Sequence, residues 1–136
     1  MREIITPDIL ALGETITDPG LRELFDLSIE KHLQPNLQEH KDAVEKMWDA
    51  FERLKTYYTD LDKQESANKI IEDISCGQTE FIEMLTAEFS ALTKIGNEFR
   101  IRHHERGKTD ITDIRYYDYF FNRCLALISL ALQFLK

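Results

Sequence analysis

Residues 97–108 contain the side chains of this sequence that are best suited to proton transfer and phosphate binding. His103 and His104 are adjacent, and imidazole is the side chain that exchanges protons near neutral pH. Basic and amide groups surround this pair, and arginine in particular offers a planar fork of donors to a phosphate group. We expect the two histidines to be catalytic. The expected binding residues are Asn97, Arg100, Arg102, Arg106 and Lys108.

The charge of this segment is opposite in sign to that of the whole chain. The formal net charge is −8, which argues against broad nonspecific binding of nucleic acid, because such binding requires a basic face. A local reversal of sign usually marks a place where an anion is bound, since field and contact geometry act locally. We therefore expect one confined site for RNA or for a nucleotide phosphate.

Helical geometry would group these side chains if the helix that precedes the cluster continued through it. Asn97, Arg100 and His104 have the spacing i, i+3, i+7 and would then share one face. Arginine would bind phosphate, histidine would exchange a proton with a 2′-hydroxyl or a leaving oxygen, and asparagine would orient either group. Such a face is a minimum for metal-free RNA cleavage. The alternative is a solvated helix end whose basic residues complement the helix dipole.

Other kinds of chemistry are not indicated by the sequence. Two metal-binding histidines on one helix normally have the spacing i, i+4, and neither the adjacent pair nor His32 and His40 have it, so no metal site is predicted. No glycine-rich phosphate loop or Gly-x-Ser-x-Gly elbow is present, and no cofactor is expected. Cys76 and Cys124 lack metal-binding spacing, so we expect free thiols in a reducing compartment.

Apolar side chains recur at three- and four-residue spacing through most of the chain, which is typical of amphipathic helices. The clearest stripe runs through residues 37–58, and further helices are predicted around residues 66–74 and from residue 79 onward. A final helix to residue 135 is apolar on nearly every side, so it is expected in the middle of a bundle or in a subunit interface. The sequence predicts an all-α fold, an antiparallel helical bundle of five or six helices.

Helix starts and core positions follow from the same pattern. Thr6 and Asp18 each precede a proline, which is the order of a capping residue and a proline at the first helical position. The side chains that we expect to be largely buried lie on the apolar faces of the longer helices: Trp48, Phe51, Leu54, Phe89, Leu92, Phe99, Phe121, Cys124, Ile128 and Leu135.

The length of 136 residues fits one helical domain, residues 1–136, with an N-terminal helical arm at 1–36 and a core at 37–136. The N-terminus lacks the pattern of a signal peptide, and the longest apolar segment, 124–135, is shorter than the ~20 residues of a membrane span. We expect a cytoplasmic protein without membrane contact. The apolar surface of the final helix exceeds what one partner face covers, which predicts a homodimer.

Two segments of the sequence resemble one known family. They are residues 41–55, KDAVEKMWDAFERLK, and residues 95–105, IGNEFRIRHHE. Together they are similar to the helical C-terminal domains of abortive-infection-type bacterial proteins, which are relatives of the HEPN (higher-eukaryote and prokaryote nucleotide-binding) domain. The resemblance implies an all-α bundle that dimerises, a role in antiviral defence beside other domains or subunits of a defence system, and metal-free ribonuclease activity in active members.

The family motif consists of arginine, a polar residue such as asparagine, and a histidine after four to six intervening positions. Asn97 and His103 match the polar residue and the histidine, whereas Gly96 stands where arginine is expected, and Arg100 would have to substitute for it. Two functions follow from this. The first is an HEPN-like domain that binds RNA or nucleotide phosphate and, if it is an enzyme, cleaves RNA without a metal. The alternative is a noncatalytic helical dimerisation or protein-interaction module.

Overall fold

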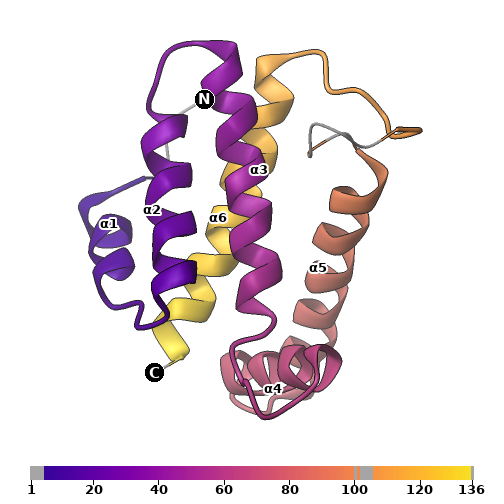
Figure 1. Cartoon of the computed structure of the whole chain (residues 1–136). Coiled ribbons are helices and arrows are strands. Elements are labelled where there is room, and N and C mark those ends of the chain that lie inside the picture. Colours follow the sequence, from indigo (N-terminus) through magenta and orange to yellow (C-terminus); the bar gives the residue numbers. More distant parts are fainter. Residues whose placement is uncertain (1–4, 100, 102–105, 136) are drawn as a thin grey trace.

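The computed structural model describes residues 5–99, 101 and 106–135, and within these ranges the fold consists of helices (Figure 1). The prediction of an all-α bundle is confirmed, and one isolated bridge between Phe99 and Thr109 is the β pairing found in the described residues. The elements are α1 (Pro7–Glu14), α2 (Pro19–His32), α3 (Leu37–Leu54), α4 (Lys63–Ser75), α5 (Thr79–Glu98) and α6 (Ile114–Phe134).

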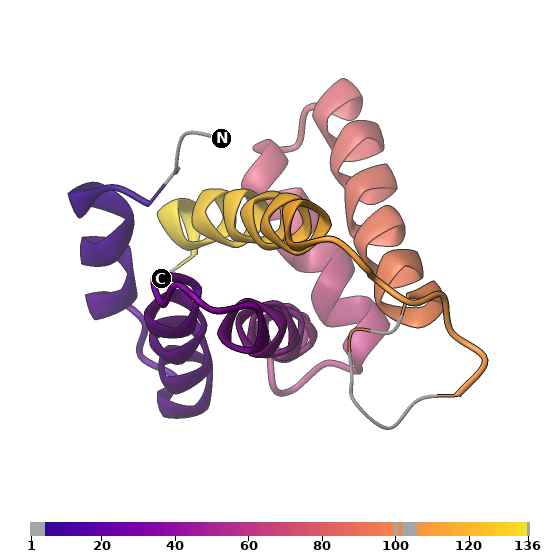
Figure 2. The same ribbon diagram turned by 90° about the horizontal axis from the view of Figure 1, so that it is seen from above.

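The helices are arranged around α3 and α6. The antiparallel helices α2 and α3 form the most extensive pair, and α6 packs on α3, α4 and α1. Viewed from above, α6 lies between α1 and α2 on one side and α4 and α5 on the other (Figure 2). This is the central position expected for a helix with apolar residues on nearly every side. No helix among the described residues has the length and apolar content needed to cross a bilayer.

Local sequence explains where several helices begin and end. The side chain of Thr6 accepts a hydrogen bond from the backbone N–H of Ile9, and Asp18 accepts one from Gly20, so both expected caps are confirmed. The helix predicted at 37–58 ends earlier, at Leu54. The reason is tertiary: the backbone N–H of Tyr58 donates to Ser66 Oγ on α4, which holds the chain in a turn.

Most of the expected core is confirmed. Eight of the ten side chains predicted to be buried are buried, whereas Phe99 and Leu135 are only partly covered. Both residues directly follow the last residue of a helix, where fewer neighbours surround a side chain. Cys124 and Cys76 are free thiols, buried and exposed respectively, and burial raises the pKa of the Cys124 thiol.

Helix α5 is covered much less than the helices beside it. It buries three of its 20 residues, Leu85, Phe89 and Leu92, whereas α6 buries eleven of 21. A hydrogen bond also holds α5 to the core, since Trp48 Nε1 donates to the Leu92 carbonyl at 2.9 Å. Gly96 leaves room for the same indole, because a Cβ there would lie 2.7 Å from Trp48 Cδ1.

Candidate functional site

The basic segment, residues 97–108, begins in the last turn of α5, and the helix does not continue beyond Glu98. Phe99 has extended dihedrals, φ −99° and ψ 154°, and the backbone N–H of Thr109 donates to the Glu98 carbonyl at 2.8 Å. Ile101 is buried in the core. The condition for a shared helical face, a helix that continues through residues 97–108, is therefore not met, because Ile101 enters the core and Thr109 binds the carbonyl that a further helical turn would use.

The described residues contain only part of the predicted site. Asn97 is exposed in the last turn of α5, Arg106 is exposed, and Lys108 is partly buried. The helix that contains Asn97 ends at the next residue, Glu98. The remaining predicted site residues lie outside the described residues: Arg100, Arg102, His103 and His104.

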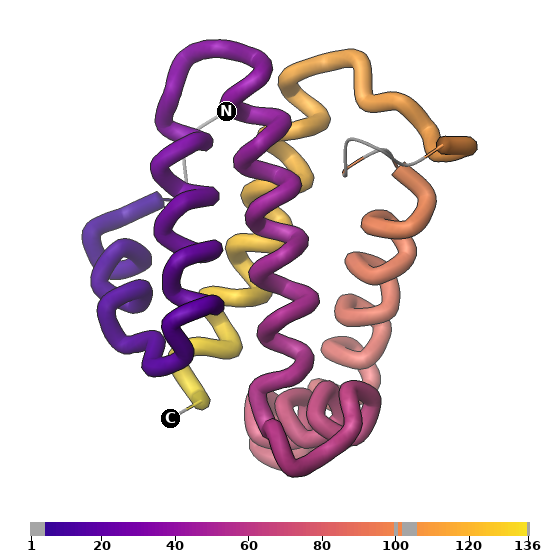
Figure 3. The backbone as a smooth tube through the Cα atoms, in the orientation of Figure 1, coloured from indigo at the N-terminus to yellow at the C-terminus, as the bar shows by residue number. Residues whose placement is uncertain are grey.

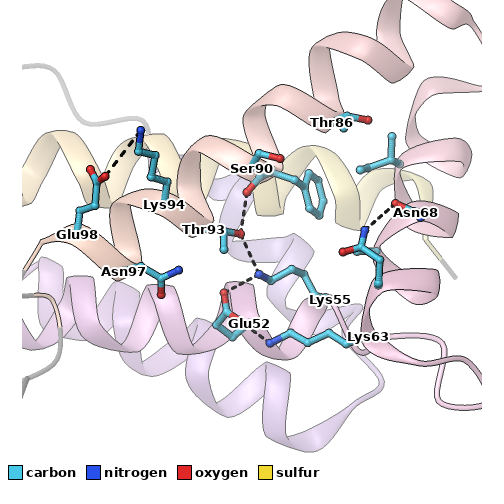
Figure 4. A pocket seen from close by; sticks show the side chains of 14 residues that line it. Glu52, Lys55, Lys63, Asn68, Thr86, Ser90, Thr93, Lys94, Asn97 and Glu98 are labelled. Carbon is cyan, nitrogen blue, oxygen red and sulfur yellow. Dashed lines mark hydrogen bonds and ion pairs between the residues drawn. The ribbon is translucent and has the colours of Figure 1, made fainter.

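One cavity borders the predicted site on the side of α3 and α4. It has a volume of about 760 Å³, and hydroxyl, amide, ammonium and carboxylate groups line it (Figure 4), together with the apolar side chains of Ala67, Ile71 and Phe89. Asn97, which belongs to the predicted site, lines one end of the cavity together with Lys94. We call this space the lysine cavity, because Lys55, Lys63 and Lys94 line it.

The charges in the lysine cavity are arranged around Glu52. Lys55 is buried, and its Nζ lies 2.7 Å from Glu52 Oε2 and donates to Thr93 Oγ1 at 3.0 Å. Lys63 pairs with the other oxygen of the same carboxylate at 2.6 Å. Burial opposes ionisation of Glu52, but the hydrogen bonds from Lys55 and Lys63 outweigh it, so the pKa of Glu52 lies below its ordinary value. The two ammonium groups thus favour the ionised form of this partly buried carboxylate.

The lysine cavity carries a small positive excess. Its lining contains three lysines and two carboxylates, those of Glu52 and Glu98. Glu98 pairs loosely with Lys94, at 3.7 Å, on the exposed rim. This excess contrasts with the net charge of −8 for the chain. The excess charge and the side-chain amide of Asn97 could hold a small anion here, whereas the Thr93 hydroxyl already donates to the Phe89 carbonyl.

A second cavity borders the predicted site on the side of α6. It has a volume of about 630 Å³ and is lined by Phe99, residues 109–112 and the first two turns of α6. Tyr116 and Tyr119 are among the most exposed large side chains, at 60% and 47%. We call this space the tyrosine cavity. Exposed aromatic rings beside basic residues can stack against nucleic-acid bases.

The rim of the tyrosine cavity also carries an ion pair. Asp113 caps α6 by accepting from the backbone N–H of Arg115, and its carboxylate pairs with the Arg115 side chain at 2.7 Å. These hydrogen bonds lower the pKa of Asp113 to about 2. The side chain of Arg115 remains 87% exposed, so a phosphate group can approach it while it keeps the cap in place.

An apolar groove lies between α5 and α6. Its volume is about 600 Å³, and its walls are mostly aliphatic: Met84, Leu85, Ala87, Ala91, Ala126, Leu127 and Leu130. The ion pair of Arg123 with Glu88, at 2.6 Å, completes the lining. Met84 is 52% exposed, and Phe81 one turn earlier is 47% exposed. Apolar surface of this kind is typical of protein–protein contacts.

One cluster of potential metal ligands was missed by the sequence analysis. His32, His40 and Asp118 come from α2, α3 and α6, and their ligand atoms lie within 4.8 Å of one another. Spacing along one helix could not identify them, because each ligand comes from a different helix. The sequence signal that was present is weak: two histidines eight residues apart across a turn that contains Pro35.

Comparison of the chain with family models, with curated proteins and with solved structures finds no significant match. The likeness to HEPN-like domains therefore rests on the two sequence segments named above.

Proposed function

We propose that this chain is an HEPN-like helical domain of a bacterial defence protein that binds RNA at the 97–108 segment. The observation that carries the proposal is the bridge between Phe99 and Thr109, which joins the two ends of the basic segment at the edge of the tyrosine cavity. Basic groups that follow the phosphate backbone and aromatic rings that stack on bases would then be neighbours. This combination is the usual means of binding a single strand without strict sequence preference.

The charge distribution supports a single confined site. Lys108 and Arg106 precede the tyrosine cavity in sequence, Arg115 lines it, and Asn97 lies on the lysine cavity at the other side of the segment. The acidic remainder of the chain repels RNA, so we expect weak binding that depends steeply on salt. If the domain is an enzyme, His103 and His104 exchange the protons, and RNA cleavage needs no metal.

Titration of a labelled single-stranded RNA at low and moderate salt tests this proposal. Arg100→Ala should abolish detectable binding, and Tyr116→Ala should weaken it by roughly 5- to 150-fold, the loss of one stacked base. Matched controls exist elsewhere on the surface: Arg22→Ala removes an exposed arginine of α2, and Phe81→Ala removes an exposed ring of α5. Both controls should bind as the wild type does.

The ribonuclease part of the proposal has its own assay. His103→Ala and His104→Ala should each leave RNA binding unchanged and remove cleavage, and wild-type cleavage should persist in EDTA. Loss of wild-type cleavage in EDTA would contradict a metal-free reaction. No detectable RNA binding by the wild type, or equal binding by Arg100→Ala and Arg22→Ala, would contradict RNA binding at this segment.

A second candidate function is dimerisation, and the groove between α5 and α6 favours it. We propose that a second copy of the chain covers this groove and the exposed side chains of Phe81 and Met84 beside it. Sedimentation at tens of micromolar should then give twice the chain mass of 16.0 kDa. Met84→Glu should yield monomers, whereas Leu33→Glu, at the equally exposed end of α2, should not. A wild-type mass of one chain would contradict dimerisation.

A further inference from the structure

Three ligand-type side chains meet at one end of the bundle. His32 is the last residue of α2, His40 lies in the first turn of α3, and Asp118 lies early in α6. These three helix ends are close together at the top of the molecule (Figure 1). Asp118 Oδ1 is 2.6 Å from His40 Nδ1 and 3.8 Å from His32 Nδ1. A single carboxylate oxygen therefore faces two imidazole nitrogens.

The contacts of His40 fix the orientation of its ring toward Asp118. Its Nε2 lies 2.6 Å from the Gln34 carbonyl, which only accepts, so Nε2 carries the hydrogen and donates it. Its Nδ1 lies 2.6 Å from Asp118, which also accepts when ionised. Nδ1 of His40 and the carboxylate of Asp118 thus converge on one place, as two ligands of one ion do. Histidine ligands of metals commonly donate their second N–H to a backbone carbonyl, as His40 does to Gln34.

The surroundings hold the ligands in place. The side chain of His32 is only 1% exposed, and its ring stacks on Phe121 with centroids 3.9 Å apart and planes 2° from parallel. The side chain of His40 is 11% exposed, and that of Asp118 is 25% exposed, so solvent reaches the cluster from the side of Asp118. An entry path and two fixed imidazoles are both features that a metal site requires.

The cation nearest to the cluster in sequence has acidic partners of its own. Lys31, the neighbour of His32, places its ammonium 3.4 Å from Glu39 and 3.8 Å from Asp42. Its charge is therefore compensated within its own ion-pair network. The carboxylate of Asp118 lies beside both imidazoles.

We propose that His32, His40 and Asp118 bind a divalent transition-metal ion of the zinc type. Two imidazoles and one carboxylate are a common set for zinc, and they leave one tetrahedral position for water or another ligand. Zinc with ligands at about 2.0–2.1 Å places tetrahedral ligand atoms roughly 3.3 Å apart. The ligand atoms here already lie within 4.8 Å of one another, so small side-chain rotations complete the site.

A metal at this position would join three helices. It would fix the start of α6 to the hairpin of α2 and α3, and the segment 106–113 enters α6 at this end after crossing the top of the bundle (Figure 3). The ion would thus anchor one end of the segment proposed to contact RNA. It lies far from the lysine cavity, since His40 and Glu52 are separated by roughly 18 Å along α3.

Titration of the purified, chelator-treated full chain with Zn²⁺ tests the proposal. Calorimetry should give one ion per chain, and Co²⁺ should give the visible absorption of a tetrahedral site with nitrogen and oxygen ligands. Asp118→Asn and His40→Gln should each weaken Zn²⁺ affinity by at least about 100-fold, since loss of even an outer partner costs 10- to 100-fold. The double variant His103→Ala/His104→Ala removes the other two histidines and should bind Zn²⁺ as the wild type does.

The outcomes of this titration either support or overturn a zinc site at His32, His40 and Asp118. Zn²⁺ should also raise the midpoint of thermal unfolding of the wild type but not that of Asp118→Asn. Asp118→Asn keeps the size of the side chain, so it serves as the test variant if His40→Gln proves unfolded. Absence of Zn²⁺ binding at tens of micromolar would overturn the proposal. Binding that survives Asp118→Asn and is lost in His103→Ala/His104→Ala would place the ion elsewhere and would also overturn it.

Discussion

Gly96→Ala should destabilise this protein, although replacement of glycine by alanine inside a helix normally stabilises it. The methyl group would meet Trp48 Cδ1 at 2.7 Å and Nε1 at 2.8 Å, whereas ordinary contacts begin at 3.4 Å. The indole must therefore move by at least the difference, and this endangers its hydrogen bond to the Leu92 carbonyl. Gly96 also lies one residue before Asn97, so the change strains the end of α5 next to the candidate site.

The expected change in stability combines one stabilising effect with two destabilising ones. Alanine gains about 1 kcal/mol in helix propensity, overpacking costs about 1–3 kcal/mol, and an unsatisfied buried partner costs about 1–3 kcal/mol. We expect a net loss of about 1–5 kcal/mol in the free energy of unfolding. Urea unfolding followed by the fluorescence of Trp48, the single tryptophan, should show a midpoint lower by roughly 1 M.

A matched control isolates the propensity effect. Ala87→Gly is the reverse change at an exposed position of the same helix, and it should cost about 1 kcal/mol with no change in the emission of Trp48. An equal or higher stability of Gly96→Ala, together with unchanged emission of Trp48, would refute the packing argument.

Other predictions concern the core and two titrating groups. Phe121→Ala should cost about 3–5 kcal/mol in urea unfolding, since the ring is fully buried, and a cost below about 1 kcal/mol would contradict its place in the core. Burial and the hydrogen bond to Asp73 raise the pKa of Tyr58 to about 12, so its contribution to stability is present below pH 10 and is lost as the pH rises toward 12. Asp73→Asn should lower that pKa in an ultraviolet titration, and an unchanged value would contradict the assignment. Hydrogen bonds from Arg53 lower the pKa of Asp18, so this exposed pair should add less than about 1 kcal/mol above pH 4, and that contribution should disappear in Arg53→Met.

The helices could be predicted from the sequence because each one carries its own pattern. The apolar stripe of α3 and the cap and proline at Thr6 and Asp18 are local signals, and both caps form as expected. The end of α3 could not be predicted in the same way. It depends on Ser66, a residue of the next helix, accepting a hydrogen bond from Tyr58. Periodicity carries no information about such a partner.

The candidate site was predictable in composition but not in geometry. The basic and histidine-rich character of residues 97–108 is evident from the sequence, whereas the end of α5 depends on Thr109 binding the Glu98 carbonyl from eleven positions later. The cluster of His32, His40 and Asp118 was missed for a related reason. Three helices must pack before these side chains become neighbours, and the two nearest in sequence are eight residues apart.

The sparse burial of α5 implies that the bundle opens in parts. A helix that buries three of its 20 residues has little to lose on local detachment, whereas α6 buries eleven of its 21. Amide hydrogens of α5 should therefore exchange with solvent well before those of α3 and α6. A ligand in the lysine cavity, which α5 helps to line, would slow this exchange, whereas an ion held by α2, α3 and α6 would leave it unchanged.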